Sequence, residues 1–343
     1  MRYGLGWRAE LGAGILANLE RIDVVEVLAE ELFEADRAKR RALQFLRSQV
    51  PVVLHATSLG LASTEPVDRK RLDKLARVVD WLQPEVWSEH LAFVRAGGAE
   101  VGHLAAPPRN DATLEGLVRN VEEARRATGS LPCLENVASL IEPPLSTYDE
   151  GAWLNAVVHA TGCELLLDLH NLHANATNFG FDALEVVRSV PAPRLIHIAG
   201  GRRIERGRLL DDHLHAVPAE VYELLAWVDE ATVILERDGN YPAIGELVRE
   251  LDAARSVVSL WSGGLSARRG RAESPSLQEA TPDAIPFLAA LYTNDAVRAR
   301  FTADPHHEAQ LHGLPEEVAQ INLDDLRLAA HSFAHKRALT ARG

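Results

Sequence analysis

The chain has 343 residues, of which 47% are hydrophobic, so it is long enough to bury a large core. Its formal net charge of −13 argues against general affinity for nucleic acids, which needs a basic face. The sequence contains no run of about 18 apolar residues, so it predicts no membrane span. The N-terminus lacks the apolar core of a signal peptide. We therefore expect a cytoplasmic protein whose two cysteines are reduced.

Short apolar segments alternate with helical patterns over the first 240 residues, which is typical of a parallel sheet covered on both faces. The eight predicted strands are Tyr3–Trp7, Val24–Ala29, Val52–Ala56, Val86–Phe93, Leu131–Val137, Glu164–Asn171, Arg194–Gly200 and Thr232–Gly239. The predicted helices between them are Arg37–Gln49, Arg69–Leu82, Thr113–Ala127, Trp153–Ala160, Phe181–Ser189 and Ala219–Val228. Eight such units predict a closed (β/α)8 TIM barrel over residues 1–261. An open doubly wound sheet is the alternative topology. It typically has a glycine-rich phosphate-binding loop after the first strand, and Gly4-Leu5-Gly6-Trp7 does not match that pattern.

The composition changes after the barrel. Residues 262–279 are rich in Ser, Gly, Arg and Glu and are predicted to form a linker. Two further helices are predicted, over Ala284–Thr302 and Leu323–Leu339. We therefore expect residues 280–343 to form a small, all-helical domain, with peptide or partner recognition as its hypothetical role.

Six consecutive apolar strands carry a polar residue at or near their carboxyl end. These residues are His55, His90, Glu135, Asp168, His197 and Glu236. The carboxyl ends of barrel strands converge on one rim, where active sites are built. Buried charges there would be costly unless they were paired or bound a metal. The loop after the seventh strand adds Asp211 and His213. The sequence therefore predicts a metal site, and its His and carboxylate donors suit iron, manganese or zinc.

These motifs resemble the multinuclear non-haem iron-dependent oxidative enzymes, a family that modifies ribosomally made precursor peptides. The matching segments are Gly4–Arg8 with Glu10-Leu11, His55 with Ser58-Leu59-Gly60, Ser88–Leu91, Leu134–Val137, Leu167-Asp168 with Asn171, Asn178–Asp182, His197–Gly200, Asp211 with His213, and Glu236–Asp238. Together they span almost all of residues 1–240 and are specific as a set.

The resemblance implies two or three iron ions of mixed ferrous and ferric state, with O2 as co-substrate. It implies a metal site made of His55, His90, Glu135, Asp168, Asn171, His197, Asp211, His213 and Glu236. Within this set, Asp168, Asn171 and His213 are the expected catalytic residues. The implied substrate is a Cys, Asp or Asn residue of a precursor peptide, which a separate leader-peptide-binding protein presents in many relatives.

The chain departs from the family pattern at two positions. His170 stands where the family has Asn, and Leu214 stands where it has a second acidic residue. Two alternatives stay open from the residues alone. One is a zinc-dependent TIM-barrel hydrolase or isomerase, and the other is a metal-carrying or peptide-binding scaffold without turnover.

Overall fold

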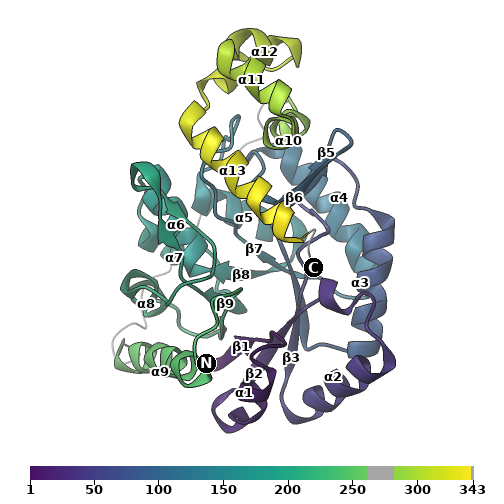
Figure 1. Ribbon diagram of the computed structural model, residues 1–343, viewed down its shortest axis with the longest axis vertical. Coiled ribbons are helices and arrows are strands. Elements are labelled where there is room, and N and C mark those ends of the chain that lie inside the picture. Colours follow the sequence, from purple (N-terminus) through teal and green to yellow (C-terminus); the bar gives the residue numbers. More distant parts are fainter. Residues whose placement is uncertain (262–281, 341–343) are drawn as a thin grey trace.

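The computed structural model describes residues 1–261 and 282–340. The linker predicted over 262–279 lies outside these residues. Eight parallel strands close into a barrel in the order β1-β12-β9-β8-β7-β4-β3-β2, which confirms the predicted TIM-barrel fold (Figure 1). The barrel strands are β1 (Arg2–Gly6), β2 (Val24–Leu28), β3 (Val52–His55), β4 (Val86–His90), β7 (Cys133–Glu135), β8 (Glu164–Asp168), β9 (Leu195–Ile198) and β12 (Thr232–Leu235).

Helices surround the barrel and connect its strands (Figure 1). They are α1 (Gly12–Leu16), α2 (Arg37–Gln49), α3 (Arg69–Leu82), α4 (Asp111–Thr128), α5 (Glu150–Thr161), α6 (Leu169–Phe179), α7 (Ala183–Ser189), α8 (Ala219–Leu225) and α9 (Ile244–Trp261). Helices α2 and α3 have the predicted bounds, because Asp36 and Asp68 cap their first turns with side-chain hydrogen bonds. Among the described residues, no helix has the length and low polarity needed to cross a bilayer.

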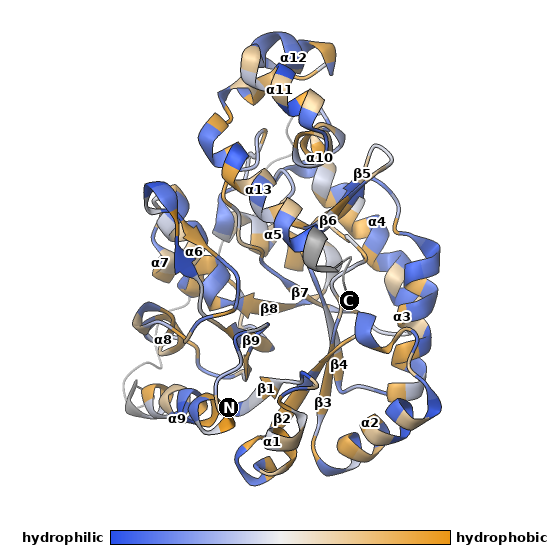
Figure 2. Cartoon of the chain, viewed as in Figure 1, coloured by the Kyte–Doolittle hydropathy of each residue, from blue (hydrophilic) through white to orange (hydrophobic). Residues whose placement is uncertain are grey.

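The barrel interior has an apolar layer toward the amino ends of the strands. Its members are Val24, Val53, Val86, Cys133, Leu166, Leu195 and Ile234. Because alternate residues of a strand face the same side, the residue two positions later on each strand also points inward. Those residues are Glu26, His55, Ser88, Glu135, Asp168, His197 and Glu236. Figure 2 shows the barrel strands mostly in the orange of hydrophobic residues, so this polar layer is the exception within them.

A β-hairpin and the C-terminal helices form a second apolar cluster beside the barrel. The hairpin consists of β5 (Phe93–Ala96) and β6 (Ala99–Ala105), and it follows directly on β4. The helices are α10 (Ile285–Thr293), α11 (Asp295–Ala303), α12 (Pro305–Leu311) and α13 (Leu323–Thr340). Both α10 and α13 contact β6, and α13 runs across the hairpin toward the barrel (Figure 1).

Several predicted elements have other bounds than the observed ones, and three of these differences have a clear physical reason. The strand predicted over Glu164–Asn171 ends at Asp168, because the Asp168 side chain caps helix α6. The strand predicted over Val86–Phe93 ends at His90, where the chain turns into the hairpin. The single helix predicted over Ala284–Thr302 is two helices, since Asn294 stops α10 and caps α11.

Candidate metal centre

All nine residues predicted to form the metal site lie at one end of the barrel. Four of them are the last residues of their strands, His197 is the last but one of β9 (Leu195–Ile198), and Glu236 follows β12 directly. Asn171 lies in the first turn of α6, and the loop after β11 (Leu209–Leu210) carries Asp211 and His213. The strand residues are His55 on β3, His90 on β4, Glu135 on β7, Asp168 on β8 and His197 on β9.

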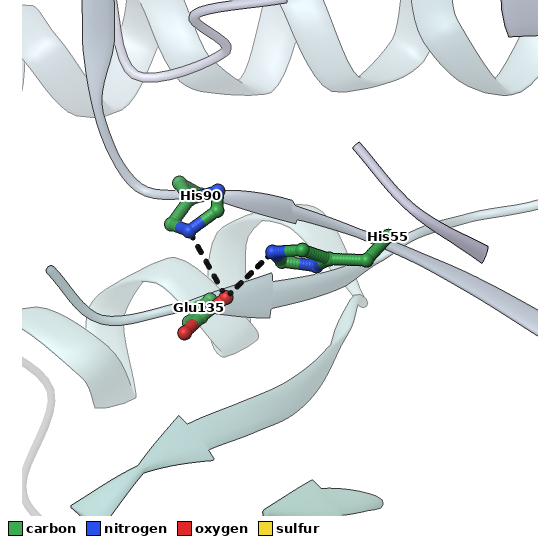
Figure 3. A group of neighbouring side chains, drawn as sticks. All are labelled: His55, His90 and Glu135. Carbon is green, nitrogen blue, oxygen red and sulfur yellow. Dashed lines mark ion pairs between the residues drawn. The ribbon is translucent and has the colours of Figure 1, made fainter. Parts of the chain in front are cut away.

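Glu135 meets two imidazoles from neighbouring strands (Figure 3). Its Oε2 lies 3.2 Å from Nε2 of His90 and 3.5 Å from Nε2 of His55. The Nδ1 atom of His55 is turned away from Glu135 and lies 2.8 Å from the hydroxyl of Ser88, which is buried. This contact holds the ring so that Nε2 faces Glu135. The three side chains form a group whose donor atoms could hold one metal ion.

His197 joins this group to a second set of carboxylates. Its Nδ1 lies 3.3 Å from both Oε1 of Glu135 and Oε2 of Glu236, yet it makes no hydrogen bond to either. Its other nitrogen, Nε2, pairs at 2.9 Å with Glu26, which is fully buried on β2. A carboxylate behind a histidine fixes the ring and raises its basicity, as is common in metal sites.

His213 lies between carboxylates from three segments. Its Nδ1 is 2.9 Å from Glu236, and its Nε2 is 2.8 Å from Asp211 and 3.6 Å from Asp168. His213 has a left-handed backbone, with φ of +54°, which is costly for a residue with a side chain. The amide N–H of Asp238 donates to the His213 carbonyl at 2.9 Å and supports this turn. His170 completes the group through Nδ1, 2.7 Å from Asp211.

Asn136 and Asn171 fix Asp168 at the strand-to-helix junction. The backbone N–H of Asp168 donates to Asn136 Oδ1 at 2.8 Å, and the Asn136 amide donates back to the Asp168 carbonyl. Oδ1 of Asp168 accepts the backbone N–H of Asn171 at 2.6 Å. The Asn171 amide nitrogen donates to the Asn136 carbonyl, which leaves its Oδ1 buried without a hydrogen-bond partner. Asn171 is therefore held in place with its acceptor oxygen available.

Arg8 closes the side of the site next to β1. Its guanidinium is 5% exposed and pairs with Glu236 at 3.2 Å and with Asp238. The charge of Arg8 is thus used within the protein, and it fixes the orientation of Glu236.

The residues fit a metal, because seven of their buried polar atoms have no hydrogen-bond partner among the described residues. These atoms are Glu26 Oε1, Glu135 Oε2, Asp168 Oδ2, His170 Nε2, Asn171 Oδ1, His197 Nδ1 and His213 Nε2. Buried polar atoms without a hydrogen bond are rare in native proteins and call for an explanation such as an ion. Nitrogen and carboxylate atoms that converge without hydrogen-bonding are the arrangement that a bound cation would satisfy.

The protonation pattern without a metal points the same way. Burial lowers the pKa of His90, but the carboxylates of Glu135 and Glu89 outweigh this effect and hold the pKa at about 9. Burial raises the pKa of Asp168 to about 7, against the opposing effect of His213. The cluster therefore carries protons where metal ions would otherwise compensate its charges, and metal binding should release them.

Sequence reasoning missed one residue of the cluster and undervalued another. Glu26 stands in the apolar segment Val24–Leu28, and a buried acid inside such a strand was the available signal. His170 was noted only as a departure from the family pattern, whereas it belongs to a group that could hold a metal with Asp211 and His213. Cys133 lies in the apolar layer, two positions before Glu135.

A separate groove on the surface of the described residues does not include this cluster. It measures about 1040 Å³, lies outside the barrel along α5 and α7, and is lined by none of the nine predicted ligands. The groove and the candidate metal centre are therefore separate features of the molecule.

Comparison with known proteins identifies a family for this chain. The family model described as "RiPP precursor modification enzyme MbnB/TglH/ChrH" matches residues 2–259. A UPF0276 protein of Streptomyces avermitilis is 39% identical over 270 residues, which cover 74% of this chain and 54% of that protein. The match thus spans about half the length of that relative. A UPF0276 protein of Anaeromyxobacter sp. is 33% identical over 262 residues, covering 74% of this chain and 92% of that one.

A solved structure shares the fold at low sequence identity. It is a xylose isomerase domain containing protein of Salmonella typhimurium, with a TM-score of 0.50, 12% identity, and coverage of 75% of this chain and 97% of that one. This likeness shows the barrel fold alone. From the match over residues 2–259 and the identity to the UPF0276 relatives, the chain belongs to the MbnB/TglH/ChrH family of enzymes that modify the precursors of ribosomally made peptides.

Proposed function

We propose that the chain is an O2-dependent oxidase that holds two or three iron ions and modifies a Cys, Asp or Asn residue of a ribosomally made precursor peptide. The observation that carries this proposal is the position of Glu135. Its Oε2 faces His55 and His90, while its Oε1 faces His197. A carboxylate that faces different imidazoles with its two oxygens can bridge two ions.

A third ion would be held by the group on the other side of His197. Asp168, His213 and Glu236 offer donor atoms close enough to share a metal, and so do His170, Asp211 and His213. Asp168 also belongs to a group with Glu135 and His197. The overlapping groups support a polynuclear centre rather than separate ions.

Iron bound there would supply the electrons and the binding position for O2. The protein residues would orient and shield it. Glu26 fixes the ring of His197, and Arg8 fixes Glu236. Asp168, Asn171 and His213 are the proposed catalytic residues. Asn171 offers a neutral oxygen, which is easier to displace than a carboxylate and so suits a position that substrate takes over.

The experiment is a metal analysis of protein purified without air, combined with Mössbauer spectroscopy and measurement of O2 consumption. We expect two or three irons per chain, some of them ferrous. The variant Glu135→Gln should lose at least one iron, because amide oxygens bridge ions poorly. The control Glu164→Gln changes an exposed carboxylate at the opposite end of the barrel, paired with Arg194, and should retain all iron.

The main alternative is a zinc-dependent hydrolase or isomerase, since His and carboxylate donors suit zinc as well as iron. Stoichiometric zinc that persists after anaerobic reconstitution with iron, without O2 consumption, would favour that alternative. The helical region after the barrel is proposed to take part in recognising the peptide or a partner protein that presents it.

A further inference from the structure

A small cavity lies where helix α13 meets the hairpin and the candidate metal centre. It measures about 40 Å³, which is room for about one water molecule or a small polar group. Asp211 lines one side, while His103 of β6 and Phe333 and Lys336 of α13 line another. Helix α13 lies beyond residues 2–259, the part that matches the family model. The region after the barrel thus contributes directly to the surroundings of the candidate site.

Lys336 is placed by contacts on the hairpin. Its Nζ lies 2.8 Å from Nε2 of His103, whose ring packs edge-on against Phe333 with 5.2 Å between the centroids. Burial and the Lys336 charge hold the pKa of His103 well below its usual value. The His103 ring is therefore neutral, and its Nε2 can accept a hydrogen bond from the ammonium group. The next residue, Arg337, donates to the Val101 carbonyl at 2.8 Å and anchors this turn of α13.

The charges around the cavity make this position selective. The candidate centre is rich in carboxylates, among them Glu135, Asp168 and Asp211, which repel an approaching acidic group. Arg8 is engaged by Glu236 and Asp238. Among the described residues that line the cavity, Lys336 is the only one with a permanent positive charge. An acidic group of a substrate would find its counter-charge here, next to the metal ligands.

We propose that Lys336 is a specificity-determining residue that binds a carboxylate of the peptide substrate in the cavity beside Asp211. This inference rests on the proposed function, because it takes the substrate to be a peptide. The carboxylate belongs to an acidic side chain or to a peptide C-terminus, since both present the same group to an ammonium ion. Either source places the neighbouring peptide atoms at the rim where Asp211 and His213 lie.

The test uses the metal-loaded full chain and two pairs of small probes that differ only in charge. The first pair is N-acetylaspartate amide and N-acetylasparagine amide, and the second is N-acetylalanine and its amide. Dissociation constants are measured by ligand-observed saturation-transfer NMR. We expect the wild type to bind the acid of at least one pair about tenfold more tightly than its amide, and the pair that shows this preference identifies the source of the carboxylate.

Variants assign the preference to Lys336. Lys336→Gln should bind acid and amide equally, whereas Lys336→Arg should retain most of the preference because the charge remains. The control Arg327→Gln removes an exposed charge from the same helix and should behave as the wild type. Equal binding of acid and amide by the wild type would overturn the proposal, and so would a preference that Lys336→Gln leaves unchanged, which a carboxylate bound directly to metal would produce.

Two further measurements keep the outcomes separate. In the wild type the preference should weaken between low and high NaCl, because salt screens a partly exposed ion pair, and this needs no folded variant. Metal content and O2 consumption are measured on the same preparations. Loss of the acid preference at unchanged iron content concerns Lys336 alone, whereas zinc in place of iron contradicts the proposed oxidase without affecting the carboxylate test.

Discussion

Asp325 connects helix α13 to the loop that carries two candidate metal ligands, and its removal is the sharpest test of this connection. The Asp325 side chain is 1% exposed and forms an ion pair with Arg208, which directly precedes β11. Arg206 approaches the same carboxylate at 3.4 Å. The loop then continues from β11 to Asp211 and His213, so the ion pair fixes the start of the segment that carries these two candidate ligands.

Replacing Asp325 by Asn should lower the free energy of unfolding by about 2–3 kcal/mol. Removing one partner of a fully buried pair costs about 3–5 kcal/mol. The expected cost is smaller here because Arg208 is 22% exposed and Arg206 is 47% exposed, so water can solvate the charges that are left. A loosened loop should also weaken metal binding about tenfold, the lower end of the effect of supporting residues.

The assay is urea unfolding of the metal-free chain, followed by metal competition against a chelator of known affinity. The matched control is Asp324→Asn, because Asp324 is the neighbouring residue but is 64% exposed and pairs only at the surface with Arg206. It should change the free energy of unfolding by no more than about 1 kcal/mol. If the two variants lose the same stability and bind metal equally well, the proposed link between α13 and the loop is wrong.

Three further predictions follow from buried contacts. Glu26→Gln should reduce metal affinity about 10- to 100-fold in a chelator competition, because the carboxylate no longer orients His197. Gly4→Ala should lower the free energy of unfolding by about 1–3 kcal/mol, since a Cβ there would lie 2.2 Å from a backbone oxygen of β2. Burial raises the pKa of Cys133 to about 12 and that of Cys163 to about 11, so both thiols stay protonated at pH 8 and should resist a disulfide reagent until the protein unfolds.

Each of these predictions has a control or a contradicting result. Glu20→Gln changes an exposed acid close to Glu26 in the chain and should leave metal affinity unaltered. Gly245→Ala places its Cβ 3.8 Å from the nearest atom, in helix α9, and should keep or raise stability. An unchanged urea midpoint for Gly4→Ala would show that β1 can shift away from β2. Rapid labelling of both thiols in the folded state would show that the apolar layer opens readily.

The barrel could be predicted from the sequence because its strands are short apolar runs separated by amphipathic helices. Polar residues at the strand ends, such as His55 and Glu135, interrupt a pattern that is otherwise uniform, and so they identified the rim. Asp168 was harder, because one residue both ends a strand and caps the next helix, and the apolar run continues through it. Local pattern does not show where strand geometry changes to helix within such a run.

Tertiary contacts explain what the sequence left undetermined. Glu26 points into the barrel because β2 has a register in which Val24 also points inward. The sequence of an apolar strand with a single acid does not indicate that this acid pairs with His197. The packing of α13 on the hairpin depends on pairs distant in the chain, such as Arg337 with Val101. The resemblance placed the nine candidate ligands, whereas the position of Lys336 beside Asp211 required the three-dimensional structure.

The apolar layer beneath the candidate ligands limits the routes by which molecules can reach them. Side chains such as Val24, Leu166 and Ile234 fill the barrel below the candidate centre. Molecules can therefore reach the centre only from the carboxyl-terminal end of the barrel. Substrate, product and small gases would have to pass through the opening at that end, beside the helix that carries Lys336. A product that stays bound at this opening excludes the next peptide. The rate of turnover would then depend on product release as much as on the chemical step.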